Sequence, residues 1–130
     1  MAPTPQTILQ ADLDAVTAVA REYIDSYVAG DAERHARVYH PECTKRRLVA
    51  DPDSGVTELL TLSPQVMADY AAASGPMDED CPAEVVVDDL SEDMASVRIY
   101  SCRWVDFAHV VRARGEWRLF HVIWHGRDAA

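Results

Sequence analysis

Apolar and polar positions alternate with two different periods along this chain. From Asp12 to Gly30 the apolar residues recur at every third or fourth position, which predicts an amphipathic helix that ends at the glycine. In the last third of the chain the period falls to two, which is typical of half-buried β-strands. The strands predicted there cover residues 84–89, 95–104, 105–112 and 117–124.

The middle of the chain carries the start and stop signals of two further helices. Asp31 is a favourable N-cap, and the helix that follows ends before Pro41, because the residue preceding a proline is disfavoured in the α region. Ser63 and Pro64 give a cap followed by a proline at the first helical position, so a third helix is predicted from there to about residue 73. Two short strands, at 44–49 and 56–62, complete this region.

The resulting element order is helix, helix, strand, strand, helix and four strands. This order predicts an α+β domain in which three N-terminal helices pack on a strongly curved, mostly antiparallel sheet. Such a sheet, preceded by helices, also suggests closure over a small-molecule cavity. The 130 residues suffice for one domain with one core. The predicted organisation is a disordered tail over 1–11, a domain over 12–126 and a tail over 127–130.

The charge and the apolar runs exclude several classes of function. The formal net charge is −10, and the one basic run, Lys45 to Arg47, is too short to form a nucleic-acid footprint, so nucleic-acid binding is not expected. The unbroken apolar runs are far shorter than the ~20 residues that span a membrane, so no membrane association is expected either. The N-terminal segment lacks the charged and apolar regions of a secretory signal.

The three cysteines, Cys43, Cys81 and Cys102, stand at wide spacing without a CxxC pair. Their odd number and spacing argue against a disulfide framework and against a structural zinc site. The simplest interpretation is a reducing, cytoplasmic compartment. The sequence contains no HxH or HExxH motif, so neither a metal nor another cofactor is predicted.

His109 is the titratable residue of greatest interest in the predicted sheet. Strand alternation puts it on one face with Phe107 and Val111, and this apolar face is expected to be pocket or core. A neutral imidazole in that setting is suited to act as a general base near neutral pH. The alternative is a hydrogen-bonded histidine in the core or at an interface. His35, by contrast, is expected at the surface.

Aromatic residues supply further candidates for a cavity. Tyr23 and Tyr27 lie about one turn apart on the first predicted helix, either as core aromatics with bonded hydroxyls or as donors that project into a cavity. Four more aromatic residues either line an apolar cavity or fill a closed core: Trp104, Phe107, Phe120 and Trp124.

Several short segments together resemble the nuclear transport factor 2-like superfamily. They extend over roughly residues 12–125 and comprise Tyr23-Ile-Asp25, Gly30 to Glu33, Tyr39 to Pro41, Lys45-Arg46, Ser63, Trp104 to Asp106, Gly115 to Trp117 and Trp124. The superfamily has a cone-shaped α+β fold and includes ketosteroid isomerases, scytalone dehydratases and polyketide-cyclase-like enzymes. Within it, the chain looks most like the proteins called putative lumazine-binding.

The resemblance to ketosteroid isomerases runs without gaps from Tyr23 to Arg47. In this match Tyr23 takes the position of the tyrosine that donates a hydrogen bond to the developing oxyanion. Arg47 takes the position of the general-base aspartate, and a guanidinium cannot take up a proton, so steroid isomerisation is not expected. The second oxyanion donor, a protonated aspartate in those enzymes, falls near residues 107–109.

The same match turns Lys45 and Arg47 toward the interior and Arg46 outward. Two inward cations imply either internal pairing with carboxylates such as Asp106 or an anionic ligand, because unpaired buried cations are costly. The resemblance also implies that Trp124 faces the cavity and that the opposite, outer face of the sheet pairs two copies into a homodimer.

The residues and the resemblance support three functional hypotheses. The first is a small-molecule-binding domain of unassigned activity, whose aromatic cavity offers tyrosine, histidine and arginine anchors. The second is a cofactor-independent isomerase, dehydratase or cyclase in which His109 moves a proton and Tyr23 stabilises an oxyanion. The third is a dimeric interaction module that binds no ligand. The candidate ligand-binding residues are Tyr27, Tyr39, Lys45, Arg47, Trp104, Phe107, Phe120 and Trp124.

Overall fold

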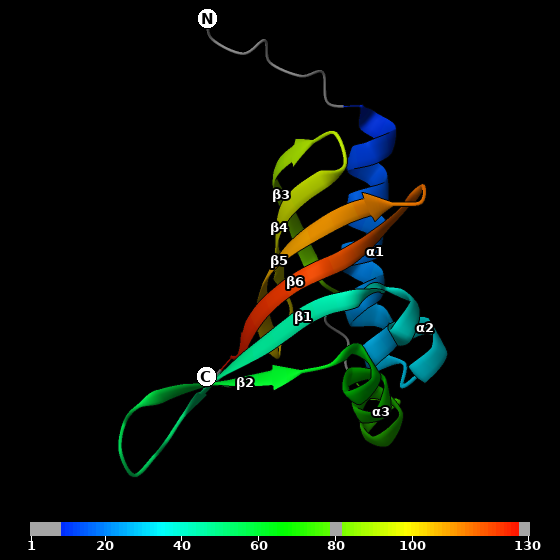
Figure 1. Cartoon of the computed structure of the whole chain (residues 1–130). Helices are drawn as coiled ribbons and strands as arrows, with labels where there is room; N and C mark the ends of the chain where they lie inside the picture. Colours follow the sequence, from blue (N-terminus) through cyan, green and yellow to red (C-terminus); the bar gives the residue numbers. More distant parts are fainter. Residues whose placement is uncertain (1–8, 79–81, 128–130) are drawn as a thin grey trace, which may run out of the picture.

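The computed structural model describes residues 9–78 and 82–127, and this part of the chain contains three helices and a six-stranded sheet (Figure 1). The helices are α1 (Gln10–Val28), α2 (Ala32–Arg37) and α3 (Pro64–Ser74). The strands are β1 (Tyr39–Ala50), β2 (Thr57–Leu62), β3 (Glu84–Ser91), β4 (Met94–Tyr100), β5 (Trp104–Ala113) and β6 (Glu116–Gly126). The predicted α+β class and the predicted succession of elements are confirmed.

The sheet is twisted and has the strand order β2-β1-β6-β5-β4-β3 (Figure 1). Neighbouring strands are antiparallel except β1 and β6, which run parallel. The sheet is not closed into a barrel, because β2 and β3 form two separate edges. The parallel pair sets Lys45 beside Val122 and Arg47 beside Trp124. Residues from distant parts of the sequence therefore share one surface of the sheet.

The long helix α1 packs along the sheet and buries the stripe that its apolar period predicts (Figure 1). Val16, Ala20, Tyr23 and Ile24 on this stripe are all buried. The strands supply the opposing buried side chains Val97, Ile99, Ala108, Val110 and Leu119. Removing such apolar surface from water contributes about 25 cal/mol per Å², so this layer forms the core of the domain.

The polar residues predicted to begin α2 and α3 cap these helices. Asp31 Oδ1 accepts a hydrogen bond from the backbone N–H of Arg34 at 3.1 Å. Ser63 Oγ accepts one from the backbone N–H of Val66, also at 3.1 Å. Each side chain satisfies one of the backbone donors that the start of a helix leaves unpaired.

Two predicted boundaries near the N-terminus are wrong. α2 ends at Arg37 rather than at the residue before Pro41, because Tyr39 already pairs with Leu119 in the sheet. α1 begins at Gln10, inside the segment predicted as a tail. The tail residues 1–8 and 128–130 lie outside the described residues.

The strand predicted over 95–104 is also too long. The chain turns after Tyr100, where the backbone N–H of Ser101 bonds to the carbonyl of Trp104 at 3.0 Å. Ser101 Oγ accepts the backbone N–H of Trp104 at 3.0 Å, which fixes the same turn. A serine hydroxyl that bonds the backbone favours a turn over a continued strand.

The strand β5 turns the opposite face inward from the one predicted. Asp106, Ala108 and Val110 are buried, whereas Phe107 is 50% exposed and His109 is exposed. The carboxyl group of Asp106 is hydrogen-bonded to Tyr23 in the interior, and this row of the strand turns inward with it. The expectation that His109 and Phe107 face a pocket or the core is therefore wrong.

A β-bulge at Phe120 interrupts the alternation of β6. The pairing changes from His109 with His121 to Val110 with Leu119, so Phe120 is the extra residue. Phe120 and His121 both line a groove on the outer surface, together with His109. Strict alternation predicts Phe120 on the inner face, and this prediction is wrong because the bulge shifts the phase.

The cysteines depart from the sequence-based expectation at one residue. Cys102 is disulfide-bonded, whereas Cys43 is a buried free thiol. The sequence argued against a disulfide framework, and the bond at Cys102 removes the support that reduced cysteines gave to the inference of a reducing compartment. Cys81 lies outside the described residues. None of the helices in the described part of the chain is long and apolar enough to cross a membrane.

Candidate functional site

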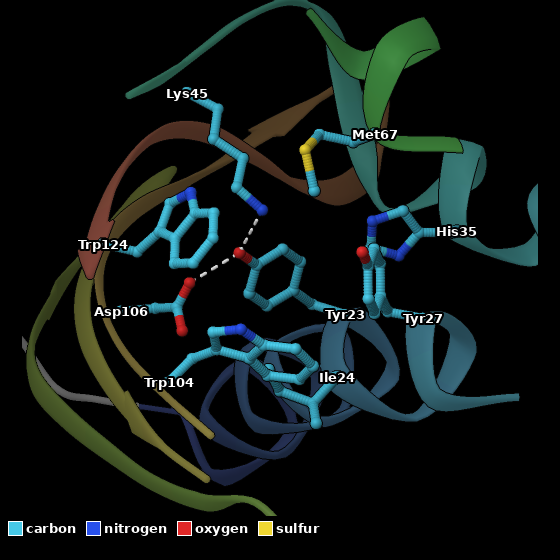
Figure 2. Close-up of a pocket in the computed structure, with 9 residues that line it drawn as sticks. All are labelled: Tyr23, Ile24, Tyr27, His35, Lys45, Met67, Trp104, Asp106 and Trp124. Atoms are coloured by element: carbon cyan, nitrogen blue, oxygen red, sulfur yellow. Dashed lines mark hydrogen bonds between the residues drawn. The ribbon is translucent and has the colours of Figure 1, made fainter. Parts of the chain in front are cut away.

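A cavity lies between the inner face of the sheet and the three helices (Figure 2). Its inner volume is about 30 Å³, and the empty space that includes its open mouth is about 300 Å³. Aromatic side chains form most of its wall, and an amine and a carboxyl group reach into it (Figure 2). The lining residues are Tyr23, Ile24, Tyr27, His35, Lys45, Met67, Trp104, Asp106 and Trp124.

The phenol oxygen of Tyr23 is the centre of the polar contacts in this cavity. It donates a hydrogen bond to Asp106 Oδ1 at 2.6 Å and accepts one from Lys45 Nζ at 2.5 Å (Figure 2). The three residues come from α1, β5 and β1, and none is more than 3% exposed. The hydroxyl therefore bridges a buried amine and a buried carboxyl group that are distant in sequence.

Burial and mutual attraction act in opposite directions on the charged groups. Burial raises the pKa of Asp106 to about 6, against the opposing effects of the Lys45 charge and the Tyr23 hydrogen bond. Burial lowers the pKa of Lys45 to about 8, against the attraction of Asp106. Burial raises the pKa of Tyr23 well above its usual value, so the phenol stays neutral. Between about pH 6 and pH 8, an ammonium and a carboxylate thus share one neutral hydroxyl.

A second series of hydrogen bonds leads from Lys45 toward the helices. Lys45 Nζ lies 3.4 Å from Tyr39 Oη, which lies 2.8 Å from His35 Nε2. His35 Nδ1 in turn lies 3.0 Å from Ser26 Oγ. Burial, together with the Lys45 charge, lowers the pKa of His35 to about 3, so the ring is neutral at ordinary pH. The expectation that His35 lies at the surface is wrong, since its side chain is fully buried.

The aromatic wall holds the amine over ring faces. Lys45 Nζ lies 4.6 Å from the ring centroid of Tyr23 and 5.2 Å from the indole of Trp124. These distances fall within the ~6 Å range in which a cation is attracted to an aromatic face. Tyr27 and Trp104 meet edge to face at 5.4 Å and continue the wall. The wall therefore provides flat apolar surfaces beside the polar centre.

Two buried polar atoms on cavity-lining residues lack a hydrogen-bond partner among the described residues. They are Asp106 Oδ2 and Trp124 Nε1. Asp106 uses only its other oxygen, in the bond with Tyr23. An unpaired buried acceptor and an unpaired buried donor are thus available in one cavity.

The sequence itself matches a known family over almost its whole length. Residues 11–125 fit the family described as putative lumazine-binding. The chain belongs to this family. The matched segment begins in α1 and ends in β6, so it contains every lining residue of the cavity. No curated protein matches the chain.

Solved structures from three organisms place this member of the putative lumazine-binding family in the nuclear transport factor 2-like fold. An NTF-2 like protein of unknown function from Silicibacter pomeroyi DSS-3 has a TM-score of 0.78 and 18% identity, over 93% of this chain and 100% of that chain. A ketosteroid isomerase-like protein from Erwinia carotovora atroseptica SCRI1043 has a TM-score of 0.65 and 14% identity, over 93% and 100%. A putative scytalone dehydratase from Novosphingobium aromaticivorans DSM 12444 has a TM-score of 0.62 and 15% identity, over 91% and 85%. Identities this low establish a shared fold alone.

In this fold the cavity brings together five of the residues singled out in the sequence, namely Tyr23, Tyr27, Lys45, Trp104 and Trp124. A sixth, Tyr39, is buried behind the wall and contacts His35 and Lys45. Of the two alternatives for Lys45, the contacts follow internal pairing, with Tyr23 between the amine and Asp106.

The other candidates lie away from the cavity. His109, Phe107 and Phe120 line grooves on the outer surface of the sheet. Arg47 is exposed, and its guanidinium carbon lies 5.0 Å from the centre of the Trp124 ring. The proton-transfer role considered for His109 depended on an inward orientation, and the side chain is exposed on the outer surface instead.

Sequence reasoning named Asp106 only as a possible partner of a buried cation and missed His35, Ile24 and Met67 as lining residues. A signal for Asp106 was present, because it follows Trp104 at the inward spacing of two that a strand requires. No sequence signal separates His35 from the surface histidines, since its burial depends on how α2 packs. Among the described residues, no group of three or more histidine, cysteine or acidic side chains is arranged to hold a metal ion.

Proposed function

We propose that the cavity binds a small carbonyl-containing organic molecule. The observation that carries this proposal is the pair of unsatisfied atoms, Asp106 Oδ2 and Trp124 Nε1, on the lining of one aromatic cavity. A buried polar atom without a partner costs about 1–3 kcal/mol, so a molecule that pairs with both atoms recovers free energy. The indole N–H can only donate and selects an acceptor such as a carbonyl oxygen. An ionised Asp106 accepts, and selects an N–H or O–H on the same molecule.

The dimensions and the wall of the cavity restrict the size and shape of the ligand. Its inner part has room for little more than two water molecules, since one water needs roughly 10–15 Å³. A compact or flat ligand fits this space, with its polar edge enclosed and the remainder toward the mouth. The rings of Trp104 and Trp124 offer the apolar surface against which a planar group stacks.

The family description supplies one probe for this proposal. Lumazine is a flat bicyclic compound that alternates carbonyl and N–H groups along one edge, which matches the donor and acceptor set inferred here. Uracil carries the same edge on a single ring. Comparison of the two separates recognition of the polar edge from tolerance of the second ring.

Indole N–H signals in NMR spectra test the proposal directly. Addition of lumazine or uracil is expected to shift the Nε1–H signals of Trp124 and Trp104, which line the cavity. Trp117, which is buried elsewhere in the core, serves as the internal control and is expected to stay unchanged. Asp106→Asn is expected to weaken binding about ten-fold or more. If the amide oxygen accepts the hydrogen bond from Tyr23, the other position is an NH₂ group, which cannot accept a hydrogen bond from the ligand. Spectra in which neither cavity indole responds to either compound would contradict the proposal.

A second candidate function is proton transfer at a carbon next to a bound carbonyl. The hydrogen bond between Tyr23 and Asp106 favours it, because it joins a neutral donor to a carboxyl group with a pKa of about 6. Asp106 would move the proton, and Tyr23 or Trp124 would stabilise the developing oxyanion. A positioned acid or base contributes typically 10²–10⁴ in rate. This candidate function belongs to the isomerase, dehydratase or cyclase class that the sequence suggested, but Asp106 takes the acid–base role in place of His109.

Exchange of carbon-bound hydrogen for deuterium tests this second candidate. Small cyclic ketones incubated with the protein in D₂O are expected to exchange their α-hydrogens faster than in buffer, and Asp106→Asn is expected to abolish the difference. Equal rates with protein and with buffer would exclude proton transfer and leave simple binding as the function.

We also propose that the outer face of the sheet pairs two copies of the chain. The supporting observation is a surface groove that contains Leu59, Phe107 and Ile123, which are 58%, 50% and 42% exposed. Apolar side chains exposed together mark interaction surfaces. Analytical ultracentrifugation is expected to detect a dimer that Phe107→Glu dissociates, whereas Tyr70→Glu on α3 leaves it intact. A monomer at every concentration would refute the pairing.

A further inference from the structure

Lys45 is the only lysine in the sequence, whereas eleven arginines supply the other basic side chains. Lysines are normally abundant on protein surfaces and are almost never fully buried without a partner. In this chain the single lysine is 3% exposed and lies in the cavity. An arginine cannot lose its proton at working pH, but a lysine can, and its neutral amine is a nucleophile. The only side-chain amine of the protein thus lies in the candidate binding site.

The surroundings of Nζ suit a neutral amine as well as an ammonium. Its hydrogen-bond partners are phenol oxygens, that of Tyr23 at 2.5 Å and that of Tyr39 at 3.4 Å. Both phenols are neutral, because burial raises the pKa of each well above its usual value. Figure 2 shows Nζ pointing into the space between the Trp124 indole, the Tyr23 ring and Met67.

The titratable groups around Nζ come from four elements. They are Tyr23 of α1, His35 of α2, Tyr39 and Cys43 of β1, and Asp106 of β5. Burial lowers the pKa of Lys45 to about 8, and only Asp106 and Cys43 oppose this change. Roughly a tenth of such an amine is neutral at pH 7, compared with fewer than one in a thousand for an ordinary exposed lysine.

We propose that Lys45 forms a covalent imine with small aldehydes or ketones that enter the cavity. The neutral Nζ attacks the carbonyl carbon, and the electrons of the C=O bond move to the oxygen. The oxygen takes up a proton, while the nitrogen loses one, and a carbinolamine results. The hydroxyl group then leaves with a further proton as water, the nitrogen gives up its remaining proton, and a C=N bond joins the carbon to Lys45. The balance is one amine and one carbonyl compound to one imine and one water, with no oxidant or reductant.

The groups beside Nζ can move the protons that these steps require. Tyr23 Oη contacts both the amine and Asp106, so it can pass a proton from the carboxyl group toward the oxygen of the adduct. Asp106 holds a proton in part of the molecules near neutral pH, because its pKa is about 6. The small enclosed space admits a carbonyl compound of only a few carbon atoms. The substrate class is therefore short aliphatic aldehydes and ketones.

Reductive trapping tests this chemistry. The folded protein is incubated at pH 7 with glycolaldehyde or acetone and sodium cyanoborohydride, which reduces an imine to a stable secondary amine. Peptide mass spectrometry then locates the added mass. The expected result is an adduct at Lys45, whose rate of formation rises with pH around a midpoint near 8. Unfolding in urea is expected to abolish the preferential reaction at Lys45.

A matched control comes from the neighbouring position. Arg46 is exposed on the other face of the strand, so Arg46→Lys adds an ordinary amine to a protein that keeps Lys45 and its fold. Within the same molecules, Lys45 is expected to react at least about ten-fold faster at pH 7 than the amine introduced at position 46. Modification at position 46 or at the N-terminal amine, with Lys45 unmodified, overturns the proposal. Equal rates at both lysines also overturn it.

The proposal uses the cavity of the proposed function but goes beyond binding, and the two can fail separately. Cavity indole shifts with uracil, in a protein that gives no Lys45 adduct, would leave the binding function standing and remove the imine. An adduct at Lys45 without any response to lumazine or uracil would support the imine and reject the ligand class proposed for binding. Tyr23→Phe is expected to slow trapping without preventing it, because the phenol positions Nζ and relays protons.

Discussion

Tyr23 and Asp106 are separated by 83 positions in the sequence, yet the hydroxyl of one bonds to the carboxyl group of the other at 2.6 Å in the interior. One lies on the long helix and the other on a central strand of the sheet. Buried carboxyl groups are tolerated when they are hydrogen-bonded, because the bond offsets part of the cost of leaving water. This contact therefore ties the helix to the sheet at the place where the cavity forms.

Tyr23→Phe removes the hydroxyl that bridges Lys45 and Asp106. We expect the free energy of unfolding to fall by about 1–3 kcal/mol, because two buried polar groups lose their shared partner. The pKa of Asp106 is expected to rise above about 6, since the bond from Tyr23 lowers it. Urea denaturation and ¹³C NMR of the carboxyl group measure the two effects. Tyr70→Phe, at an exposed site on α3, is the control and is expected to change stability by no more than about 0.5 kcal/mol.

Asp106→Asn should lower the pKa of Lys45 below about 8, because the Asp106 charge is the chief influence that opposes the effect of burial. The single lysine gives a single side-chain NMR signal, so its titration can be followed without assignment of other lysines. Asp88→Asn, which removes an exposed partner of Arg98, is the control and should leave that titration unchanged. An unaltered Lys45 titration in the Asp106 variant would show that the two charges are not coupled.

The fold was predictable because its signals are local. The apolar stripe of α1, the caps Asp31 and Ser63, and the period-two strands each depend on a few neighbouring residues. Tyr23, Lys45 and Trp124 could also be assigned to the cavity, because a known pattern fixed their register. In these regions local preference and tertiary packing agree.

Which row of β5 side chains is buried could not be predicted from the composition of that strand alone. Strand alternation predicted the row of His109 inward, although Asp106, in the opposite row, was also considered as the partner of a buried cation; the structure buries the row of Asp106 and exposes His109. The reversal has a tertiary cause, because Asp106 is stabilised inside by Tyr23, which lies on another element. The bulge at Phe120 adds one residue to β6 in a similar way, and no glycine or proline in the sequence marks it.

Gly30→Ala is expected to destabilise the domain through a backbone contact. A Cβ at Gly30 would lie 2.7 Å from the Cα and the carbonyl carbon of Gly75, closer than carbon atoms pack. Gly30 also has a φ of +70°, which costs a residue with a side chain about 1–2 kcal/mol. Gly55→Ala separates the two effects, since Gly55 has a φ of +73° but no atom within 4 Å of the added carbon. Denaturation should give a larger loss for Gly30→Ala, and equal losses would mean that the contact with Gly75 relaxes freely.

His35 should make the stability of the domain depend on pH. Its pKa is lowered from 6.5 to about 3 in the folded state, so between these values the unfolded chain binds more protons than the native protein. The stabilisation from the neutral, buried ring is therefore fully present above pH 6.5 and is lost as the pH falls toward 3. At ~1.4 kcal/mol per pKa unit, the maximum loss is on the order of 5 kcal/mol. Asp106 acts in the opposite sense between pH 6 and 3.8, because its folded pKa is raised and protonation relieves the cost of a buried charge.

The variant His35→Gln isolates the histidine contribution, because glutamine keeps hydrogen-bonding groups but does not titrate in this range. It is expected to be less stable than the parent protein at pH 7, and the difference is expected to shrink as the pH is lowered from 7 to about 4. Urea denaturation at intervals of pH measures both curves, with Asp106 contributing equally to each. His109→Gln, at an exposed position on the outer face, is the matched control for the substitution itself and should change stability at pH 7 by no more than about 0.5 kcal/mol. A curve for His35→Gln that runs parallel to that of the parent protein would mean that the buried imidazole takes up a proton in the native protein, contrary to its enclosure between Ser26 and Tyr39.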